Sequence, residues 1–269
     1  MVAPPDGGLA MIDSGHNETT GWRPSEYIRY TLGLTLLDHL FVQNADNDHV
    51  SDLDGLPRHG VNVAILHRNP SHTPRVLRTL KADGTTRGVE QFIAMCGEYT
   101  APVPALTRPA VGGVTYSAFW NRWPWVAETN DLSLVLFLKY GPFKILFPGD
   151  LEPAGWENLL LMPGFLQELC GTTILVASHH GRKSGFCDEI FNYFTPSAVV
   201  ISDKPVAHLT QDVDYSPVVH PSGVCVLNQA RRRHVLTTRK DGDILFRVYP
   251  DGTYSIETQN GWHPSLKAA

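Results

Sequence analysis

Asn44-Ala45-Asp46-Asn47-Asp48-His49 is the stretch around which the chain is organised. It directly follows a hydrophobic run, residues 36–43, that we predict to be a strand. Alternate residues would face the same way if the chain stayed extended, and His49 would turn inward where the extension ends. A polar turn that caps a helix is the alternative for this stretch taken alone.

The composition is that of a globular protein with a full core. Of the 269 residues, 42% are hydrophobic, and the net charge of −5 offers no global basic field for nucleic acid. No apolar run reaches membrane-spanning length, and the N-terminus lacks a signal pattern, so we expect a cytoplasmic protein without membrane contact. The four cysteines are widely spaced, which predicts buried free thiols in a reducing compartment: Cys96, Cys170, Cys187 and Cys225.

Hydrophobic periodicity and turn residues predict alternating strands and helices along the chain. In the first half we expect strands at 9–12, 36–43, 61–66 and 115–120, and helices at 24–32, 74–82 and 86–96. We predict a loop at residues 101–114. We expect residues 121–125 to be an aromatic turn that packs on the core, with a lid that contacts substrate as the alternative. In the second half we expect strands at 132–139, 143–147, 173–177, 198–201, 224–227, 234–238, 243–249 and 253–258, with helices at 153–169, broken at Pro163-Gly164, and 188–194.

Polar side chains that can bind a metal follow several of these predicted strands. Asp13 follows the first strand, Asp150 follows the strand at 143–147, and His179-His180 follow the strand at 173–177. Ligands in α/β proteins bind at the carboxyl ends of strands, so these residues and the Asn44–His49 stretch are candidates for one site. Each also has a structural explanation as a turn, a helix cap or a core histidine.

Taken together, these segments resemble the metallo-β-lactamase fold, in the branch typified by the hydrolase domain of the competence (DNA-uptake) protein. The order is D-x-G, a donor cluster ending in Asp-His, a strand ending in Gly-Asp, and a strand ending in His-His-Gly. Residues 130–136 with 144–152 resemble the family's N-x-x-S-L-V-L hairpin and G-D-x-E segment, and 174–184 resemble its H-H-G-S-x-x-S strand end.

The resemblance covers most of residues 9–56 and 130–248 and is thin over 57–128, a variable insert region. It implies one domain over residues 1–269 with a four-layer αββα sandwich. The family begins with a further strand and a V-G-x-G-D turn, which this sequence lacks, so we expect a short gene model or a trimmed form.

The metal loop departs from the family's pattern. The family has H-x-H-x-D-H, whereas this chain has N-x-D-x-D-H, with Asn44 and Asp46 in place of two histidines. The resemblance implies a metal held by Asp48, His49, Asp150 and one of His179 or His180. Carboxylate and amide oxygens suit Mg²⁺ or Mn²⁺, whereas imidazoles suit Zn²⁺, so the site could hold either kind of metal. It could hold one ion, or two ions with Asn44 and Asp46 as additional ligands.

Other residues take roles that the resemblance implies. Asp48 would orient or deprotonate the attacking water while serving as a ligand, and Asp13 would fix the tautomer of a ligand histidine. Asn130 is nearest in context to the family's remaining first-site histidine. Arg182 and Lys183 either contact a substrate phosphate or are solvated loop charges.

These observations lead to two alternative functions, an enzyme and a non-catalytic module. The first is a metal-dependent hydrolase that cleaves phosphodiester bonds of a nucleotide or nucleic acid. The second is a catalytically degenerate binding or regulatory module, which the replaced histidines favour. The sequence contains no G-x-S-x-G, Walker or G-x-G-x-x-G motif for another chemistry.

Overall fold

The structure is a computed structural model that describes residues 1–104, 112–203, 212–227 and 229–261. The chain divides into two compact units. Unit 1 comprises Met1–Gly113 and Trp120–Leu134, and unit 2 comprises Val114–Phe119 and Val135–Ala269. Each unit combines a β-sheet with helices, which confirms the predicted α/β class.

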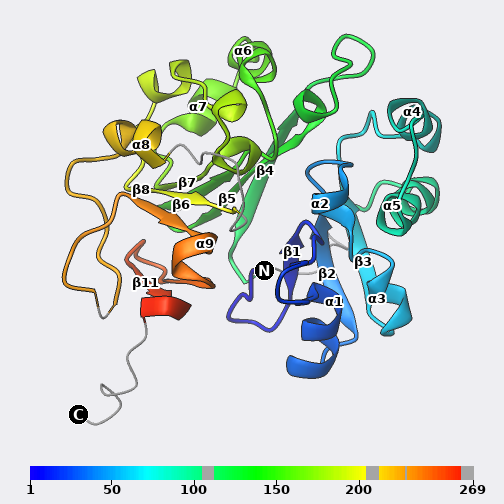
Figure 1. Cartoon of the computed structure of the whole chain (residues 1–269), viewed down its shortest axis with the longest axis horizontal. Coiled ribbons are helices and arrows are strands. Elements are labelled where there is room, and N and C mark those ends of the chain that lie inside the picture. Colours follow the sequence, from blue (N-terminus) through cyan, green and yellow to red (C-terminus); the bar gives the residue numbers. More distant parts are fainter. Residues whose placement is uncertain (105–111, 204–211, 228, 262–269) are drawn as a thin grey trace. The chain divides into compact units, whose positions relative to one another are not determined.

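Unit 1 is built on a three-stranded parallel sheet in the order β1-β2-β3 (Figure 1). Its strands are β1 (Ala10–Ile12), β2 (Leu36–Phe41) and β3 (Asn62–His67). Its helices are α1 (Pro24–Glu26), which continues as a π-helix over Tyr27–Thr31, α2 (Asn47–Val50), α3 (Gly55–Arg58), α4 (Pro74–Leu80) and α5 (Arg87–Glu98), with a 3₁₀ turn at Asn130–Leu132. The chain leaves the first helical segment at Gly33, whose φ of +71° suits glycine.

The core of unit 1 forms where α5 packs against the sheet. The helix presents buried side chains at positions 89, 92, 93 and 96, the spacing of one helical face. These side chains join Leu37 and Val42 of the β2 segment and Leu77 of α4 in one hydrophobic cluster. Helix α5 therefore covers one face of the sheet, and the carboxyl ends of the strands lie along one edge of the sheet.

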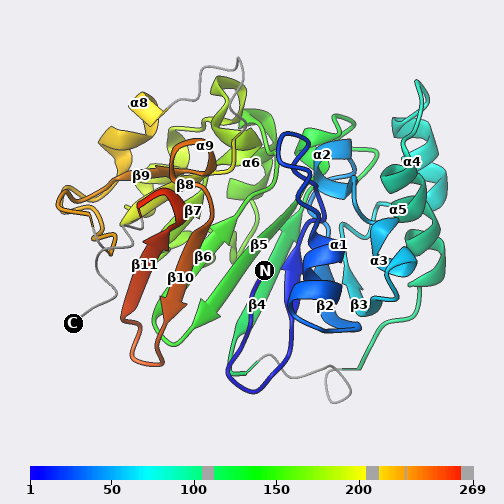
Figure 2. The same ribbon diagram turned by 60° about the horizontal axis from the view of Figure 1, so that its bottom comes forward.

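Unit 2 is built on a six-stranded sheet in the order β4-β5-β6-β7-β8-β9. Its strands are β4 (Thr115–Trp120), β5 (Leu134–Tyr140), β6 (Phe143–Phe147), β7 (Ile174–Val176), β8 (Ala198–Ile201) and β9 (Val235–Thr237). β5 and β6 are antiparallel across Gly141, and β6 to β9 are parallel. A separate antiparallel hairpin is formed by β10 (Ile244–Val248) and β11 (Tyr254–Thr258) (Figure 2).

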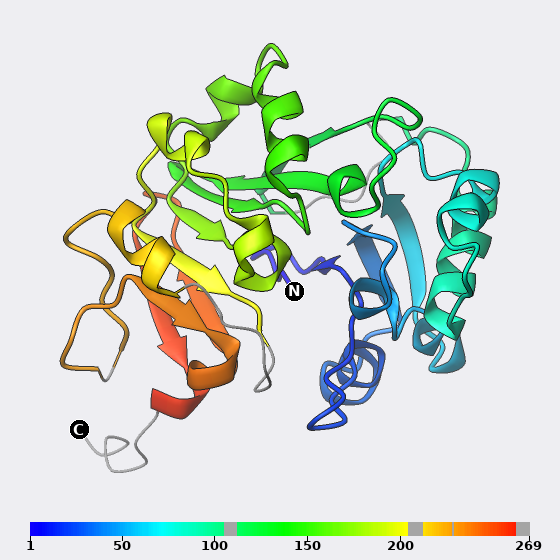
Figure 3. The same ribbon diagram turned by 45° about the horizontal axis from the view of Figure 1, so that its top comes forward.

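Short helices complete unit 2 (Figure 3). They are α6 (Pro153–Leu160), α7 (Phe165–Leu169), α8 (Asp212–Tyr215) and α9 (Thr238–Asp241), with 3₁₀ turns at Ser178–Gly181, Lys183–Gly185, Glu189–Asn192, Ser216–Val218 and Gln259–Gly261. α6 and α7 are separated at Gly164, whose φ is +87°, so the predicted break is confirmed.

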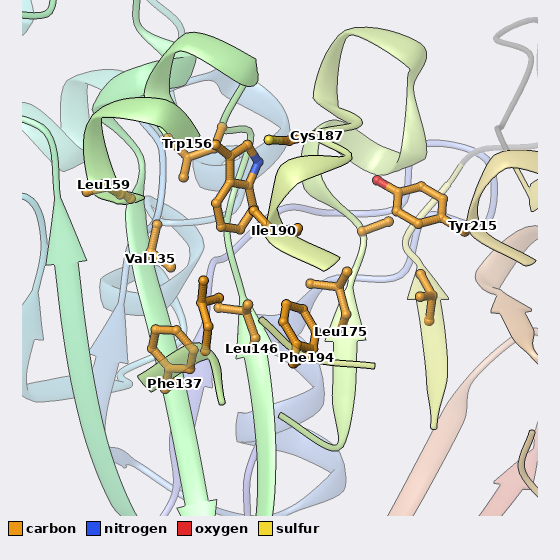
Figure 4. Close-up of a cluster of buried hydrophobic side chains, with 14 of the residues drawn as sticks. Val135, Phe137, Leu146, Trp156, Leu159, Leu175, Cys187, Ile190, Phe194 and Tyr215 are labelled. Carbon is orange, nitrogen blue, oxygen red and sulfur yellow. The ribbon is translucent and has the colours of Figure 1, made fainter. Parts of the chain in front are cut away.

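The six-stranded sheet has a core on each face, because successive strand residues point to opposite sides. Leu175 and Val199 belong to one hydrophobic cluster with Trp156 of α6. Figure 4 shows Leu175 on the same side of the sheet as Trp156. Their neighbours Ile174 and Ala198 face the other way and pack in the cluster that includes Ile256 of β11. Two buried faces explain why these strands read as continuous hydrophobic runs.

Several local predictions are wrong. The segment 224–227 is not a strand; Val224 makes one isolated bridge to Arg233. Trp125 in the predicted aromatic turn is 80% exposed, so it does not pack on the core. The four cysteines are free, but only Cys96 and Cys187 are buried. Part of the predicted loop, residues 105–111, lies outside the described residues.

Candidate functional site

In unit 1 the candidate residues follow parallel strands at one edge of the sheet. Asp13 comes directly after β1, and the Asn44–His49 loop comes after β2. Parallel strands end at a common edge, so residues far apart in the sequence meet there. The edge therefore collects carboxylate, amide and imidazole groups.

Asp13 fixes the orientation of His49. The Asp13 Oδ2 atom lies 2.7 Å from His49 Nδ1, and Asp13 Oδ1 accepts the Gln43 backbone N–H at 2.7 Å. A carboxylate accepts the proton on Nδ1, which assigns the lone pair of the neutral ring to Nε2. His49 is buried, so the ring is held by packing as well as by this bond.

The D-x-G turn also holds the backbone of the donor loop. The Ser14 N–H donates to the His49 carbonyl at 2.7 Å, and the Asp52 N–H donates to the Ser14 carbonyl at 2.8 Å. A Cβ at Gly15 would lie 1.8 Å from the Asp48 carbonyl oxygen. Only glycine permits this approach, which brings Asp13 within reach of His49.

The loop itself is not extended throughout. Asp46 has extended φ and ψ at the N-cap position, and the helical turn α2 begins at Asn47. The expectation that residues 44, 46 and 48 alternate along an extended chain is therefore wrong from Asn47 onward, because a helical turn changes the side-chain period. Asp46 makes no capping hydrogen bond with its side chain.

Asn44 and Asp46 make contacts within unit 1. Asn44 is fully buried; its Nδ2 donates to Ser133 Oγ at 3.2 Å, and its Oδ1 accepts the Asp46 N–H at 3.1 Å. The Asp46 carboxylate is paired with the Lys81 ammonium. Sequence reasoning missed both partners, since neither is near the loop in sequence.

Asn130, a further candidate of unit 1, and His16, which follows the D-x-G turn, both lie close to ordinary structural partners. Asn130 begins the 3₁₀ turn that leads into β5, where its carbonyl accepts the Ser133 N–H at 3.0 Å. His16 Nδ1 lies 2.7 Å from Ser51 Oγ.

In unit 2 the candidates follow the parallel strands β6 and β7. Gly149, with φ of +65°, turns the chain after β6. The next residue, Asp150, is buried. His180 follows β7, and its Nδ1 lies 2.8 Å from the carbonyl of Ser202, which follows β8. Because a carbonyl can only accept, His180 carries its proton on Nδ1 and its lone pair on Nε2. That Nε2 lies 3.7 Å from Asp150 Oδ1.

His179 has a different set of partners. Its Nε2 lies 2.9 Å from Arg182 Nη1, which can only donate, so the ring accepts there. Its Nδ1 lies 3.1 Å from Glu152 Oε1 and 3.0 Å from Ser184 Oγ. Arg182 thus engages the lone pair of His179, whereas His180 Nε2 lies 3.7 Å from Asp150 Oδ1.

The backbone at these two histidines is unusual. His179 and His180 have φ of +48° and +56°, the left-handed region that L-residues avoid. A Cβ at Gly185 would lie 2.5 Å from the Ser178 carbonyl oxygen, so the next turn closes tightly on this segment. Strained backbone of this kind concentrates at functional sites.

The two basic candidates differ in their surroundings. Arg182 is half-buried and bonded to His179, while Lys183 is exposed. The partners Glu152, Ser184 and Ser202 were not singled out from the sequence. Glu152 carried a signal, because it belongs to the G-D-x-E segment quoted above.

Four side chains of the described residues each offer one atom that could bind a metal ion. They are Asp48 and His49 of unit 1, and Asp150 and His180 of unit 2. Imidazole and carboxylate groups are donors that accept Zn²⁺ and Mn²⁺.

Comparison with known proteins finds one informative similarity. No family model matches the chain. The chain is 23% identical over 272 residues to ComE operon protein 3 of Bacillus subtilis (strain 168), and the match covers 94% of this chain and 32% of that protein. The chain therefore spans about a third of the length of this relative. The similarity agrees with the competence-protein type suggested by the sequence motifs.

None of the described helices combines the length and the apolar character that crossing a membrane requires.

Proposed function

We propose that this chain is a metal-dependent hydrolase that cleaves phosphodiester bonds, with Asp48, His49, Asp150 and His180 as the metal ligands. The observation that carries the proposal is the orientation of the two histidines. Each donates from Nδ1 to a fixed acceptor, Asp13 for His49 and the Ser202 carbonyl for His180. Histidines that bind metals through Nε2 are oriented in this way.

The same reasoning selects His180 over His179 as the ligand. The Arg182 guanidinium is hydrogen-bonded to His179 Nε2, so a metal ion binding at that atom would have to displace a cation. We assign His179 to positioning Arg182, with Glu152 accepting from the other ring nitrogen. Arg182 would then bind a substrate phosphate through its remaining N–H groups, and exposed Lys183 would add charge.

A divalent ion held here would lower the pKa of a bound water and polarise the scissile group. Asp48 would orient and deprotonate the attacking water. Asp13 would keep the imidazole of His49 in the ligand tautomer. Asn44 and Asp46 support the loop through Ser133 and Lys81 in this scheme.

The proposal is tested by elemental analysis together with a panel of phosphodiester, lactone and β-lactam substrates, after loading with zinc, manganese or magnesium. We expect bound metal and phosphodiester cleavage. Asp48→Ala and Asp150→Ala should each lower the rate by at least about 10²-fold. Asp188→Ala, which changes an exposed carboxylate of unit 2, should leave the rate unchanged. A chain that binds none of the three metals would overturn the proposal.

A binding or regulatory module is the second candidate. It is favoured by the engagement of Asn44 and Asp46 in contacts within unit 1. It predicts that Asp48→Ala leaves the biological effect of the protein intact. If that variant loses the effect while circular dichroism shows an unchanged fold, the result would count against a non-catalytic binding or regulatory module.

A further inference from the structure

Lys81 reaches the first half of the donor loop from the end of α4. Its ammonium pairs with Asp46. The Lys81 side chain is only 16% exposed and that of Asp46 is 32% exposed, so the pair is partly shielded from solvent. A shielded pair is screened less by salt than a pair on the open surface.

The position of Lys81 is built into the fold. It lies in the connection between α4 and α5, and the start of α5 is fastened to α2. The Thr86 hydroxyl donates to Asn47 Oδ1 at 2.6 Å, and a Cβ at Gly88 would lie 2.1 Å from the Val50 carbonyl oxygen. The connection is thus held against the loop at several points.

A buried histidine lies near the same ammonium. His72 is fully buried, and neither ring nitrogen has a hydrogen-bond partner within the described part of the chain. Burial, together with the smaller effects of the Arg68 and Lys81 charges, lowers the pKa of His72 to about 3. His72 is therefore a neutral imidazole close to Lys81 at neutral pH.

We propose that the Lys81 ammonium is the resident cation of the Asn44–Asp46 half of the loop and keeps a metal ion out of it. Asp46 carries one negative charge, which Lys81 already balances. A divalent ion at the same carboxylate would meet the repulsion of the ammonium. Metal is then confined to the Asp48–His49 half, an inference that rests on the proposed function for the presence of metal there.

The test is a titration with Mn²⁺ and with Zn²⁺ in which bound equivalents are counted by elemental analysis after dialysis. Lys81→Met should bind one equivalent more than the unchanged chain. The double variant Lys81→Met/Asp46→Asn should lose that extra equivalent. Arg78→Met is the matched control, because Arg78 lies on the same helix and pairs with Glu90 instead. No gain in Lys81→Met would overturn the inference.

A second variant keeps the test decisive if Lys81→Met does not fold. Asp46→Asn should leave the number of bound ions unchanged, because Asp46 binds Lys81 and not metal. Loss of an ion in this variant would show that Asp46 is a ligand and would overturn the inference.

Failure of the proposed function gives a different pattern. If the unchanged chain binds no ion, the hydrolase proposal fails, while an Asp46-dependent gain of one ion in Lys81→Met still supports the role of Lys81. In the expected case, Asp48→Ala removes the ion of the unchanged chain and leaves the extra ion of Lys81→Met in place.

Discussion

The donor loop of unit 1, residues 44–49, and the donor turn of unit 2, residues 178–181, follow parallel strands but are held in different ways. The first forms the helical turn α2 and is fixed by contacts from Ser14, Lys81 and Thr86. The second places two successive histidines in the left-handed region. The first segment has ordinary backbone that is packed closely by neighbouring elements. The second has strained backbone that is held by hydrogen bonds to the carbonyls of Gly149 and Ser202.

Because the two segments are held differently, they should be sensitive to different substitutions. A loop fixed by close contacts is disturbed most by added volume, since backbone atoms cannot move aside without shifting an element. A strained turn is disturbed less by volume than by residues that raise the cost of a positive φ. The following changes separate the two cases, in order of expected effect.

Gly15→Ala should produce the largest loss. The new methyl group would overlap the Asp48 carbonyl oxygen, which belongs to the backbone and cannot rotate away. We expect unfolding to become easier by about 3 kcal/mol, measured by urea denaturation. Gly97→Ala is the control: its Cβ would lie at an ordinary 3.5 Å from Pro74 Cγ. Equal stability of both variants would contradict the packing account of the loop.

Asp13→Asn should lower the affinity for a divalent metal by about 10–100-fold, the usual cost of losing a carboxylate behind a ligand histidine. The carboxylate accepts from both His49 and the Gln43 N–H, and an amide cannot accept on both atoms. Competition with a chelator measures the affinity. Asp38→Asn, which alters a carboxylate that accepts the Leu9 N–H, should change it little. The assignment of Asp13 fails if both variants bind alike.

His72→Leu should flatten the acid limb of the stability curve. The pKa of His72 is about 3 in the folded chain, below the usual 6.5, so the unfolded chain binds the extra proton between these values. Its contribution is present above pH 6.5 and is lost as the pH falls towards 3, with a slope of up to about 1.4 kcal/mol per pH unit. Denaturation at several pH values tests this. The exposed His220, replaced by Leu, should leave the slope unchanged.

Exchanging glycine and alanine at one position of each segment gives the smallest effect and the sharpest contrast. At His179, Gly should be more stable than Ala by about 1 kcal/mol, because Ala at positive φ is strained. At Asn47, in α2, Ala should be more stable than Gly by roughly 0.5–1 kcal/mol, because Gly is a poor helix residue. Thermal melts of the four variants measure both. The same preference at both positions would remove the distinction drawn here.

Sequence reasoning recovered most of the strands and helices, for a clear physical reason. The runs at β4 and β8 were predicted with their observed bounds. β8 is an unbroken apolar segment, which is typical of a strand buried in a sheet. It failed where a segment depends on a distant partner: residues 224–227 look like a strand but pair at only one point with Arg233. The turn α2 was expected only as the alternative, a polar turn that caps a helix, because Asn and Asp favour turns and caps over helix interiors.

Local sequence patterns were sufficient to predict which strand ends carry carboxylates and imidazoles, since hydrophobic periodicity and motif order depend on neighbouring residues alone. The partners of these groups depend on the tertiary fold. It paired Asp46 with Lys81, His49 with Asp13, His180 with the Ser202 carbonyl and His179 with Arg182. Most of these contacts join residues more than twenty positions apart, and no local pattern encodes such a contact. The chemistry available to each donor is therefore set by the packing of elements, and not by the motif that contains it.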